Sequence, residues 1–347
     1  MILLPSRQQA APDPDGRKDA PLPGGAPMRE RLASVSLDLD NLWSYLKVHG
    51  DDGWRDRPSY FDTFAPLMLE VLADLDIHIT FFIVGRDAAE ARNAPALRSL
   101  VAAGHELASH SHEHEPWLHL YTREQLVAEI RACSDAIFDA TGVRVDGFRG
   151  PGFSWSPQLL EVLADEGYRY DASTLPSYLG PIARAYYFWS SGLTKEERKQ
   201  RKGLFGSFAD GLRPVKPYRW QLASSRSLIE IPVTTIPVFK TPFHFSYLTW
   251  LAQRSEAAMW TYLSIALAMC RLTGTEPSFL LHPLDVMGGD RVPQLSFFPG
   301  MELPSARKIA LLKQVLKVIG SKYRLVPMGE HASAIEQRPA LAMREAA

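Results

Sequence analysis

Residues 104–114 read GHELASHSHEH and hold four of the ten histidines of the chain. Leu107–Ser109 predicts the end of a short buried strand, so the histidines stand where a strand gives way to a loop. His110 and His114 are four residues apart, so both imidazoles leave the same face if the turn here is helical. Two imidazoles and one carboxylate make a three-ligand metal site with one position open for water or substrate. The alternative interpretation of this stretch is a solvated histidine-rich loop.

Length and composition restrict the class of protein. A chain of 347 residues suits one large α/β barrel or two ordinary domains. Hydrophobic residues make up 46% and charged residues 22%, as in a folded protein with a large core. The formal net charge is −1 and no basic stripe with interleaved aromatic residues occurs, so we expect no nucleic-acid partner. Cys133 and Cys270 lie in apolar helical patterns, which predicts buried free thiols and fits a reducing compartment.

The two ends of the sequence differ from its middle. Residues 1–28 are rich in Pro, Gly, Asp and Ala, which predicts a disordered arm. Residues 29–334 are the predicted folded part, and residues 335–347 read as a polar tail. The first residues do not form a signal peptide, and no run of eighteen apolar residues could span a bilayer. We therefore expect a cytoplasmic enzyme.

Strand and helix patterns alternate along most of the folded part. Strands are predicted at 32–37, 79–84, 107–109, 145–148, 168–170, 228–232, 278–282 and 325–326, and helices at 63–74, 95–103, 122–141, 156–165, 247–272 and 305–319. This order is typical of an α/β fold with a parallel sheet. Asp62 is the predicted N-cap of the first helix, with Pro66 tolerated in its first turn. Residues 42–60 are expected to be a substrate-facing loop that carries Trp43.

Residues 177–226 interrupt the alternation and are predicted to be an insertion at the mouth of a barrel. The run 181–189 is aromatic, and either lines a substrate site or packs on the barrel. The run 195–202 is highly charged, and is either a solvated helix face or a peripheral contact with an anionic membrane.

Polar side chains follow five of the predicted strands at their carboxyl ends. They are Asp38 and Asp40, His110 and His114, Arg149, Asp171, and His282. In a parallel barrel all these ends open on one face, so the coincidence predicts an active site there. Other interpretations stay open. The two first aspartates could form a turn, Arg149 could pair with Asp171, and His282 could cap its strand. His105 and His112 are expected to be structural.

These motifs give the chain a likeness to a known family. It resembles the polysaccharide deacetylase (NodB-homology) family, carbohydrate esterase family 4, from about residue 34 to 282. Residues 104–114 resemble the second motif of that family, His-[Ser/Thr]-x-x-His. Asp38-Leu39-Asp40 resembles the first motif, Arg149-Gly150-Pro151 the third and Leu280-Leu281-His282 the fifth. The four stretches occur in the order of the family.

The resemblance implies a fold and a cofactor. The fold is a distorted (β/α) barrel with seven or eight parallel strands, here with an inserted segment. The cofactor is a divalent metal held by Asp40, His110 and His114. Zinc is the first expectation, with Co²⁺, Fe²⁺ or Ni²⁺ as alternatives.

The resemblance also implies roles at the site. Asp38 would be the general base, Arg149 would hold that aspartate, and His282 would be the general acid. The backbone N–H of Phe153 would bind the oxyanion and Leu280 would line the acyl pocket. Trp43 and Pro151 are further expected substrate contacts. The fourth motif of the family, an Asp-Trp pair that supports the histidine, is missing, and Asp171 or Asp285 is the candidate replacement.

The predicted function is metal-dependent removal of an N-acetyl group from an amino sugar of a glycan or lipid-linked sugar. The alternatives are a deformylase or cyclic-amide hydrolase of the same fold, and a non-catalytic glycan-binding relative. The sequence predicts no oligomeric state.

Overall fold

Seven parallel strands form the centre of this computed structural model, which describes residues 30–180, 208–224 and 226–346. In spatial order they are β7 (Ser227–Glu230), β5 (Tyr170–Asp171), β4 (Gly147–Phe148), β3 (Glu106–Ser109), β2 (Thr80–Ile83), β1 (Leu32–Asp38) and β8 (Ser278–Leu281). After β7 the N–H of Thr234 donates to the carbonyl of Ser278 in β8 at 3.1 Å, which links the two outer strands. The predicted distorted barrel of parallel strands is confirmed.

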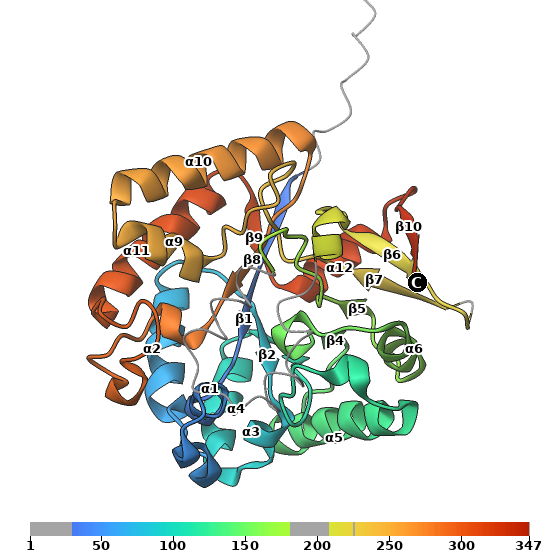
Figure 1. The fold of residues 1–347 in the computed structure, drawn as a ribbon, viewed down its shortest axis with the longest axis horizontal. Helices are drawn as coiled ribbons and strands as arrows, with labels where there is room; N and C mark the ends of the chain where they lie inside the picture. Colours follow the sequence, from blue (N-terminus) through green and yellow to red (C-terminus); the bar gives the residue numbers. More distant parts are fainter. Residues whose placement is uncertain (1–29, 181–207, 225, 347) are drawn as a thin grey trace, which may run out of the picture. The chain divides into compact units, whose positions relative to one another are not determined.

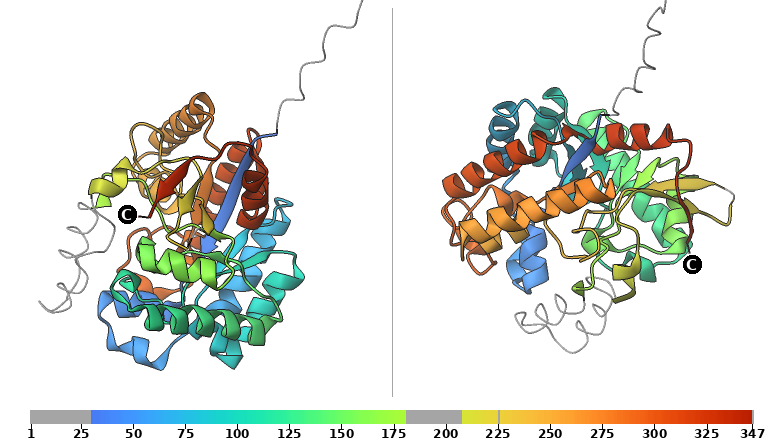
Figure 2. Two further views of the ribbon diagram at one scale, coloured as in Figure 1. Left: turned by 90° about the vertical axis from the view of Figure 1, so that its right-hand side faces the viewer. Right: turned by 90° about the horizontal axis from the view of Figure 1, so that it is seen from above.

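Helices surround these strands (Figure 1 and, from two further directions, Figure 2). They are α1 (Leu42–His49), α2 (Phe61–Ala73), α3 (Gly85–Ala89), α4 (Ala94–Ala102), α5 (Arg123–Thr141), α6 (Pro157–Asp165), α9 (Phe245–Ala252), α10 (Glu256–Thr273), α11 (Ser305–Gly320) and α12 (Met328–Glu336). Their ends follow local sequence signals. Thr122 and Gln125 form a capping box at the start of α5, and Gly142 ends that helix in the left-handed region. None of the helices in the described ranges is long and apolar enough to cross a membrane.

The strands separate two cores because alternate residues point to opposite faces. The larger core lies between strands and helices and contains Val35 and Leu37 of β1. The smaller core lies inside the barrel and includes Phe82 of β2. Helix α12 contributes Met328, Ala332 and Ile335 to this inner core, so it closes one end of the barrel. Polar side chains on the inner face therefore lie between α12 and the carboxyl ends of the strands.

Three local predictions are wrong. Residues 42–60 contain α1, capped by Asn41, and a short 3-10 helix at Asp52–Asp56, so they are not a simple loop. Helix α2 begins at Phe61 after Tyr60, so Asp62 does not cap it and Pro66 lies beyond its first turn. The single helix expected at 247–272 is two helices, α9 and α10, because the Ser255 side chain caps a new start.

The predicted insertion and tail both contribute strands. β6 (Tyr218–Gln221) pairs antiparallel with β7, and β10 (Met343–Glu345) pairs with β6. The polar tail is thus partly ordered in the sheet, and Arg31–Ala347 form one compact unit. β9 (Arg324–Val326) pairs with β1. The arm at 1–28, the aromatic run at 181–189 and the charged run at 195–202 lie outside the described residues.

Glu276 joins the start of β1 to the end of α12. It accepts a hydrogen bond from the N–H of Leu32 at 3.3 Å, and it pairs with His331 at 3.4 Å and with Arg338. Burial alone would raise the pKa of Glu276, but His331 and Arg338 lower it to about 2. An acid with a lowered folded-state pKa stabilises the fold above its unfolded pKa, and that contribution is lost as the pH falls towards 2.

We expect Glu276→Gln to lower the free energy of unfolding by about 2 kcal/mol at pH 7, and by progressively less from pH 5 to pH 3. Urea denaturation over this range measures the difference from wild type. Glu330→Gln is the matched control, because Glu330 pairs with Arg324 on the surface and about half its side chain is exposed. A pH-independent loss in Glu276→Gln would contradict the assignment.

Candidate active site

Strand register places the predicted site residues next to one another. Leu37 pairs with Leu281 between β1 and β8, so Asp38 and His282 follow side by side. Ser109 pairs with Phe148 between β3 and β4, so His110 and Arg149 are neighbours. Leu37, Phe148 and Leu281 belong to the larger core outside the barrel, and Ser109 is the register partner of Phe148. Side chains alternate along a strand, so the four polar residues that follow them point into the barrel. The predicted clustering of polar strand ends is therefore present.

Asp40, His110 and His114 form a group that could hold a metal ion. Each offers one ligand atom, and these atoms lie within 4.8 Å of one another. His114 Nε2 is 2.9 Å and His110 Nε2 is 3.6 Å from Asp40 Oδ1. Among the described residues, that buried oxygen has no hydrogen bond of normal geometry. A buried carboxylate oxygen close to two imidazoles but bonded to neither fits a donor set arranged around a cation.

The second nitrogen of His110 fixes its orientation. His110 Nδ1 lies 2.7 Å from the carbonyl oxygen of Arg149, to which it donates, so Nε2 carries the free lone pair. Burial lowers the pKa of His110, which keeps the ring neutral. Burial would raise the pKa of Asp40, but His114, His110 and His282 lower it to about 2, so this carboxylate is ionised. A neutral imidazole and an ionised carboxylate are the forms that bind metals.

The turn that carries the histidines is not helical, although the interpretation of the spacing between His110 and His114 assumed a helical turn. Ser111 and His114 have φ values of +62° and +57°, in the left-handed region. The Glu129 carboxylate of α5 accepts hydrogen bonds from the N–H groups of His112 (2.8 Å) and Glu113 (2.7 Å). Such strained conformations persist where surrounding contacts fix them. Glu129 was missed, although its position on the buried stripe of α5 was a signal for a buried partner.

Arg149 pairs with Asp38 at the centre of the site. Its Nη1 lies 2.6 Å from Asp38 Oδ1 and donates to Ser36 Oγ at 3.0 Å, and its Nε donates to the carbonyl of Ala172 at 3.1 Å. The side chain of Arg149 is 0% exposed and that of Asp38 is 7% exposed. The ion pair that the resemblance implies is present, and the alternative ion pair between Arg149 and Asp171 is wrong.

Asp171 does not belong to the site. Its neighbours Tyr170 and Ala172 are in the inner core, so Asp171 points outwards. There it accepts a hydrogen bond from Ser173 and lies against Glu230, which accepts from Thr174 Oγ1 at 2.6 Å. Burial raises the pKa of Asp171, and burial with the charge of Asp171 raises the pKa of Glu230 well above its ordinary value. The prediction of a catalytic Asp171 fails because the register turns its side chain away.

Asp285 is the carboxylate beside His282. Its Oδ2 accepts from the His282 N–H at 2.8 Å, and its Oδ1 accepts from Ser246 Oγ at 2.9 Å. Ser246 Oγ is also 3.4 Å from His282 Nδ1. Asp285 and Ser246 therefore fix both the backbone and the ring of His282. Ser246, at the start of α9, had no signal in the sequence.

The four predicted substrate contacts differ in their placement. Trp43 is buried, its Nε1–H donates to Asp87 at 2.8 Å and its ring edge meets His114. Trp43 therefore supports the candidate metal ligand His114, and the prediction that it contacts substrate is wrong. The N–H of Phe153 donates to the Gly150 carbonyl at 2.9 Å and is not free for an oxyanion. Leu280 is buried but belongs to neither of the two cores. This placement is compatible with the predicted acyl-pocket role. Pro151 is buried in the short 3-10 helix Pro151–Phe153, which also carries Phe153.

Asp87 is a second residue that the sequence did not reveal. It is buried and accepts hydrogen bonds from Asn41 Nδ2 at 2.7 Å and from Trp43. Burial raises the pKa of Asp87 to about 7. Asp87 thus ties Asn41, the residue after Asp40, to Trp43, whose ring edge meets His114.

His105 and His112 lie outside the ligand group, as expected. His105 Nδ1 accepts a hydrogen bond from the N–H of Ile79 at 3.3 Å, at the start of the strands. His112 lies beside Gly85 and Glu113.

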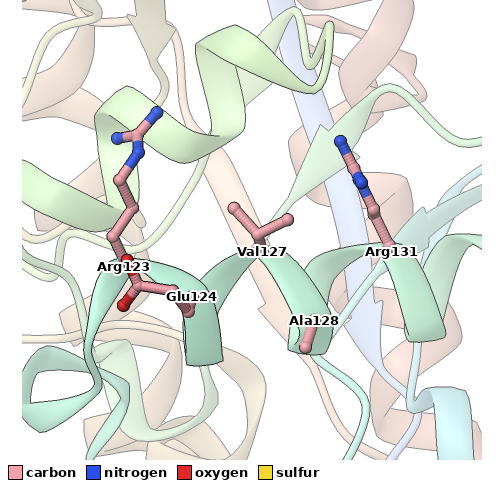
Figure 3. Close-up of a pocket in the computed structure, with 5 residues that line it drawn as sticks. All are labelled: Arg123, Glu124, Val127, Ala128 and Arg131. Carbon is pink, nitrogen blue, oxygen red and sulfur yellow. The ribbon is translucent and has the colours of Figure 1, made fainter.

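A cavity of about 410 Å³ lies elsewhere, on the surface of α5 (Figure 3). Its lining residues are Arg123, Glu124, Val127, Ala128 and Arg131. Arg123 pairs with Asp165 and Arg131 pairs with Glu166, both at the end of α6. Both arginines of the lining are thus paired with acidic residues outside it, and none of the predicted site residues lines the cavity.

Residues 49–170 match the sequence model of a family described as polysaccharide deacetylase. This match supports an assignment of the chain to the polysaccharide deacetylase (NodB-homology) family. The matched range includes His110, His114 and Arg149. A solved structure of a Mycobacterium smegmatis protein assigned to the polysaccharide deacetylases has the same fold, with a TM-score of 0.55, 18% identity, and coverage of 94% of this chain and 98% of that one.

Two curated relatives are similar to part of this chain. Chitin deacetylase 1 of Cryptococcus neoformans var. grubii is 33% identical over 111 residues, which are 32% of this chain and 21% of that protein. Chitooligosaccharide deacetylase of Sinorhizobium fredii is 35% identical over 106 residues, which are 30% of this chain and 47% of that protein. The chain thus matches less than half the length of either relative.

The outward carboxyl pair gives a test of the placement of Asp171. An acid whose folded pKa is raised loses stabilisation as the pH rises through and above its unfolded pKa. We therefore expect Asp171→Asn to have a higher melting temperature than wild type at pH 8 and the same one near pH 4. Thermal unfolding at the two pH values measures this. A strong loss of stability at pH 8 would show that the ionised side chain has a favourable partner instead.

Proposed function

We propose that this protein is a metal-dependent hydrolase that removes an N-acetyl group from an amino sugar of a glycan or lipid-linked sugar. The observation that carries the proposal is the group of Asp40, His110 and His114 beside the buried pair of Asp38 and Arg149. A divalent metal, zinc first, held by these three donors would lower the pKa of a water molecule and polarise the acyl carbonyl.

Asp38 is the group suited to take a proton from the attacking water. It stands two residues before Asp40, and its carboxylate is held by Arg149 at 2.6 Å. The guanidinium fixes the direction of this carboxylate, which a base requires. As the water oxygen bonds to the acyl carbon, its proton passes to Asp38.

His282 is the group suited to protonate the leaving amine. Breaking the C–N bond releases the amino sugar only if its nitrogen gains a proton, and histidine donates protons near neutral pH. Ser246 lies 3.4 Å from Nδ1, which leaves Nε2 for the substrate. The products are acetate and the free amino sugar.

The Arg149–Ser154 loop provides the remaining contacts. Since the N–H of Phe153 is engaged, we assign the oxyanion donor to Gly152, whose N–H has no acceptor among the described residues. Leu280 offers an apolar wall for the acetyl methyl group.

The names of the relatives support an amino-sugar substrate, because they are a chitin deacetylase and a chitooligosaccharide deacetylase. The alternative functions are a deformylase or a cyclic-amide hydrolase that uses the same residues, and a glycan-binding protein that binds without turnover. Acetate and formate release from N-acylated sugars, with allantoin as the cyclic amide, separates these functions.

We expect Asp38→Asn to retain the metal and to lose at least 100-fold in kcat, since a general base contributes about 10²–10⁴-fold. Acetate release from N-acetylglucosamine oligosaccharides measures turnover, and elemental analysis measures metal. Asp171→Asn is the matched control, because Asp171 is a buried aspartate at the end of another strand and faces away from the site. Equal turnover in wild type and Asp38→Asn would refute the base assignment.

We expect His114→Ala to lose metal on dialysis, because two ligands remain where three converged. Elemental analysis after dialysis against a weak chelator measures the metal content. His112→Ala is the control, with metal content as in wild type. Full metal retention in His114→Ala would contradict the ligand set.

A further inference from the structure

His244 lies beside the proposed catalytic groups but has no role in the chemistry described above. It is the residue before α9, between Phe243 and Phe245, both fully buried in the larger core. These two anchors hold the backbone in place on either side. Two residues later Ser246 contacts both His282 and Asp285. The position of His244 is therefore fixed by the packing that also positions His282.

The imidazole of His244 lacks a partner. Its Nδ1 is buried and has no hydrogen bond among the described residues. His282 lowers and Asp38 raises the pKa of His244, so both charges act on the ring. A buried ring nitrogen without a partner is costly, and such groups in functional sites are commonly satisfied by a ligand.

The ring is uncharged. Burial, and secondly the charge of His282, lower the pKa of His244 to about 3. A neutral imidazole has one donor and one acceptor nitrogen, which matches a hydroxyl group. A phosphate or carboxylate would instead favour the charged ring.

Aromatic rings continue from His244 along α9. The Tyr247 ring is 6.4 Å from that of His244 and stacks on Trp250 at 5.7 Å with an interplanar angle of 22°. Trp250 is 41% exposed. The Arg254 guanidinium also lies 3.8 Å over the Trp250 ring, so the faces of this ring are engaged within the protein.

We propose that His244 is a substrate-binding residue that hydrogen-bonds a hydroxyl group of an uncharged amino sugar, next to the amide that is cleaved. This rests on the proposed function. His244 acts by binding and transfers no proton.

The test compares His244→Leu, which removes the hydrogen bond, with His244→Gln, which keeps a neutral donor and acceptor. We expect His244→Leu to raise KM for N-acetylglucosamine oligosaccharides roughly tenfold, with kcat within threefold of wild type. His244→Gln should stay within threefold in both constants and keep the wild-type pH profile. His78→Leu is the control, an exposed histidine ahead of β2. His244→Ala replaces the Leu variant if that one unfolds in circular dichroism.

Binding separates this inference from the proposed function. Calorimetry on zinc-loaded Asp38→Asn, with and without His244→Leu, measures affinity for the same oligosaccharides without turnover. A roughly tenfold weaker affinity supports the inference even if wild type releases no acetate or formate, a result that would refute only the proposed function. Equal affinities, or no binding by either protein, overturn the inference. A large fall in kcat at constant KM in His244→Leu also overturns it, because it would assign proton transfer to His244.

Discussion

The buried ion pair of Arg149 and Asp38 is the interaction on which the site depends. Arg149 lies inside the barrel, reaches β1 through Asp38 and Ser36, and stacks on Phe82 of β2 at 4.2 Å. Its backbone carbonyl accepts from His110, and its Nη2 contacts Met328 Sδ of α12 at 3.5 Å. Breaking a buried pair by removing one partner costs about 3–5 kcal/mol, since the other charge stays buried. The same residue thus orients a proposed base and a proposed ligand.

Strand register explains which polar residues join this pair. A strand sends successive side chains to opposite faces, so a polar residue at a strand end reaches the inner site only if its position has the right parity. Asp38, His110 and Arg149 have it, whereas Asp171 does not. On the outer face Asp171 is buried beside Glu230, and burial raises the pKa of both carboxyl groups.

Side chains from the helices then fix the loops above the strands. Glu129 of α5 holds the histidine turn in its left-handed conformation, and Asp87 holds Asn41 and Trp43. Ser246 of α9 reaches His282. These supports lie far in sequence from the residues they orient. A site assembled in this way keeps its donors in place before any ligand arrives, which reduces the cost of binding one.

The sequence by itself determined the fold class, the polar strand ends and the metal-ligand candidates, because strand–helix alternation and the His110–His114 motif are local patterns. It also left Asp171 and Asp285 as equal candidates, and it made Trp43 a loop residue. Only the tertiary structure decided these points. The face on which Asp171 lies depends on strand register, and the hydrogen-bond partners of Trp43 and Phe153 come from distant or sharply turned backbone. Such contacts depend on how elements pack, and no spacing along the chain encodes them.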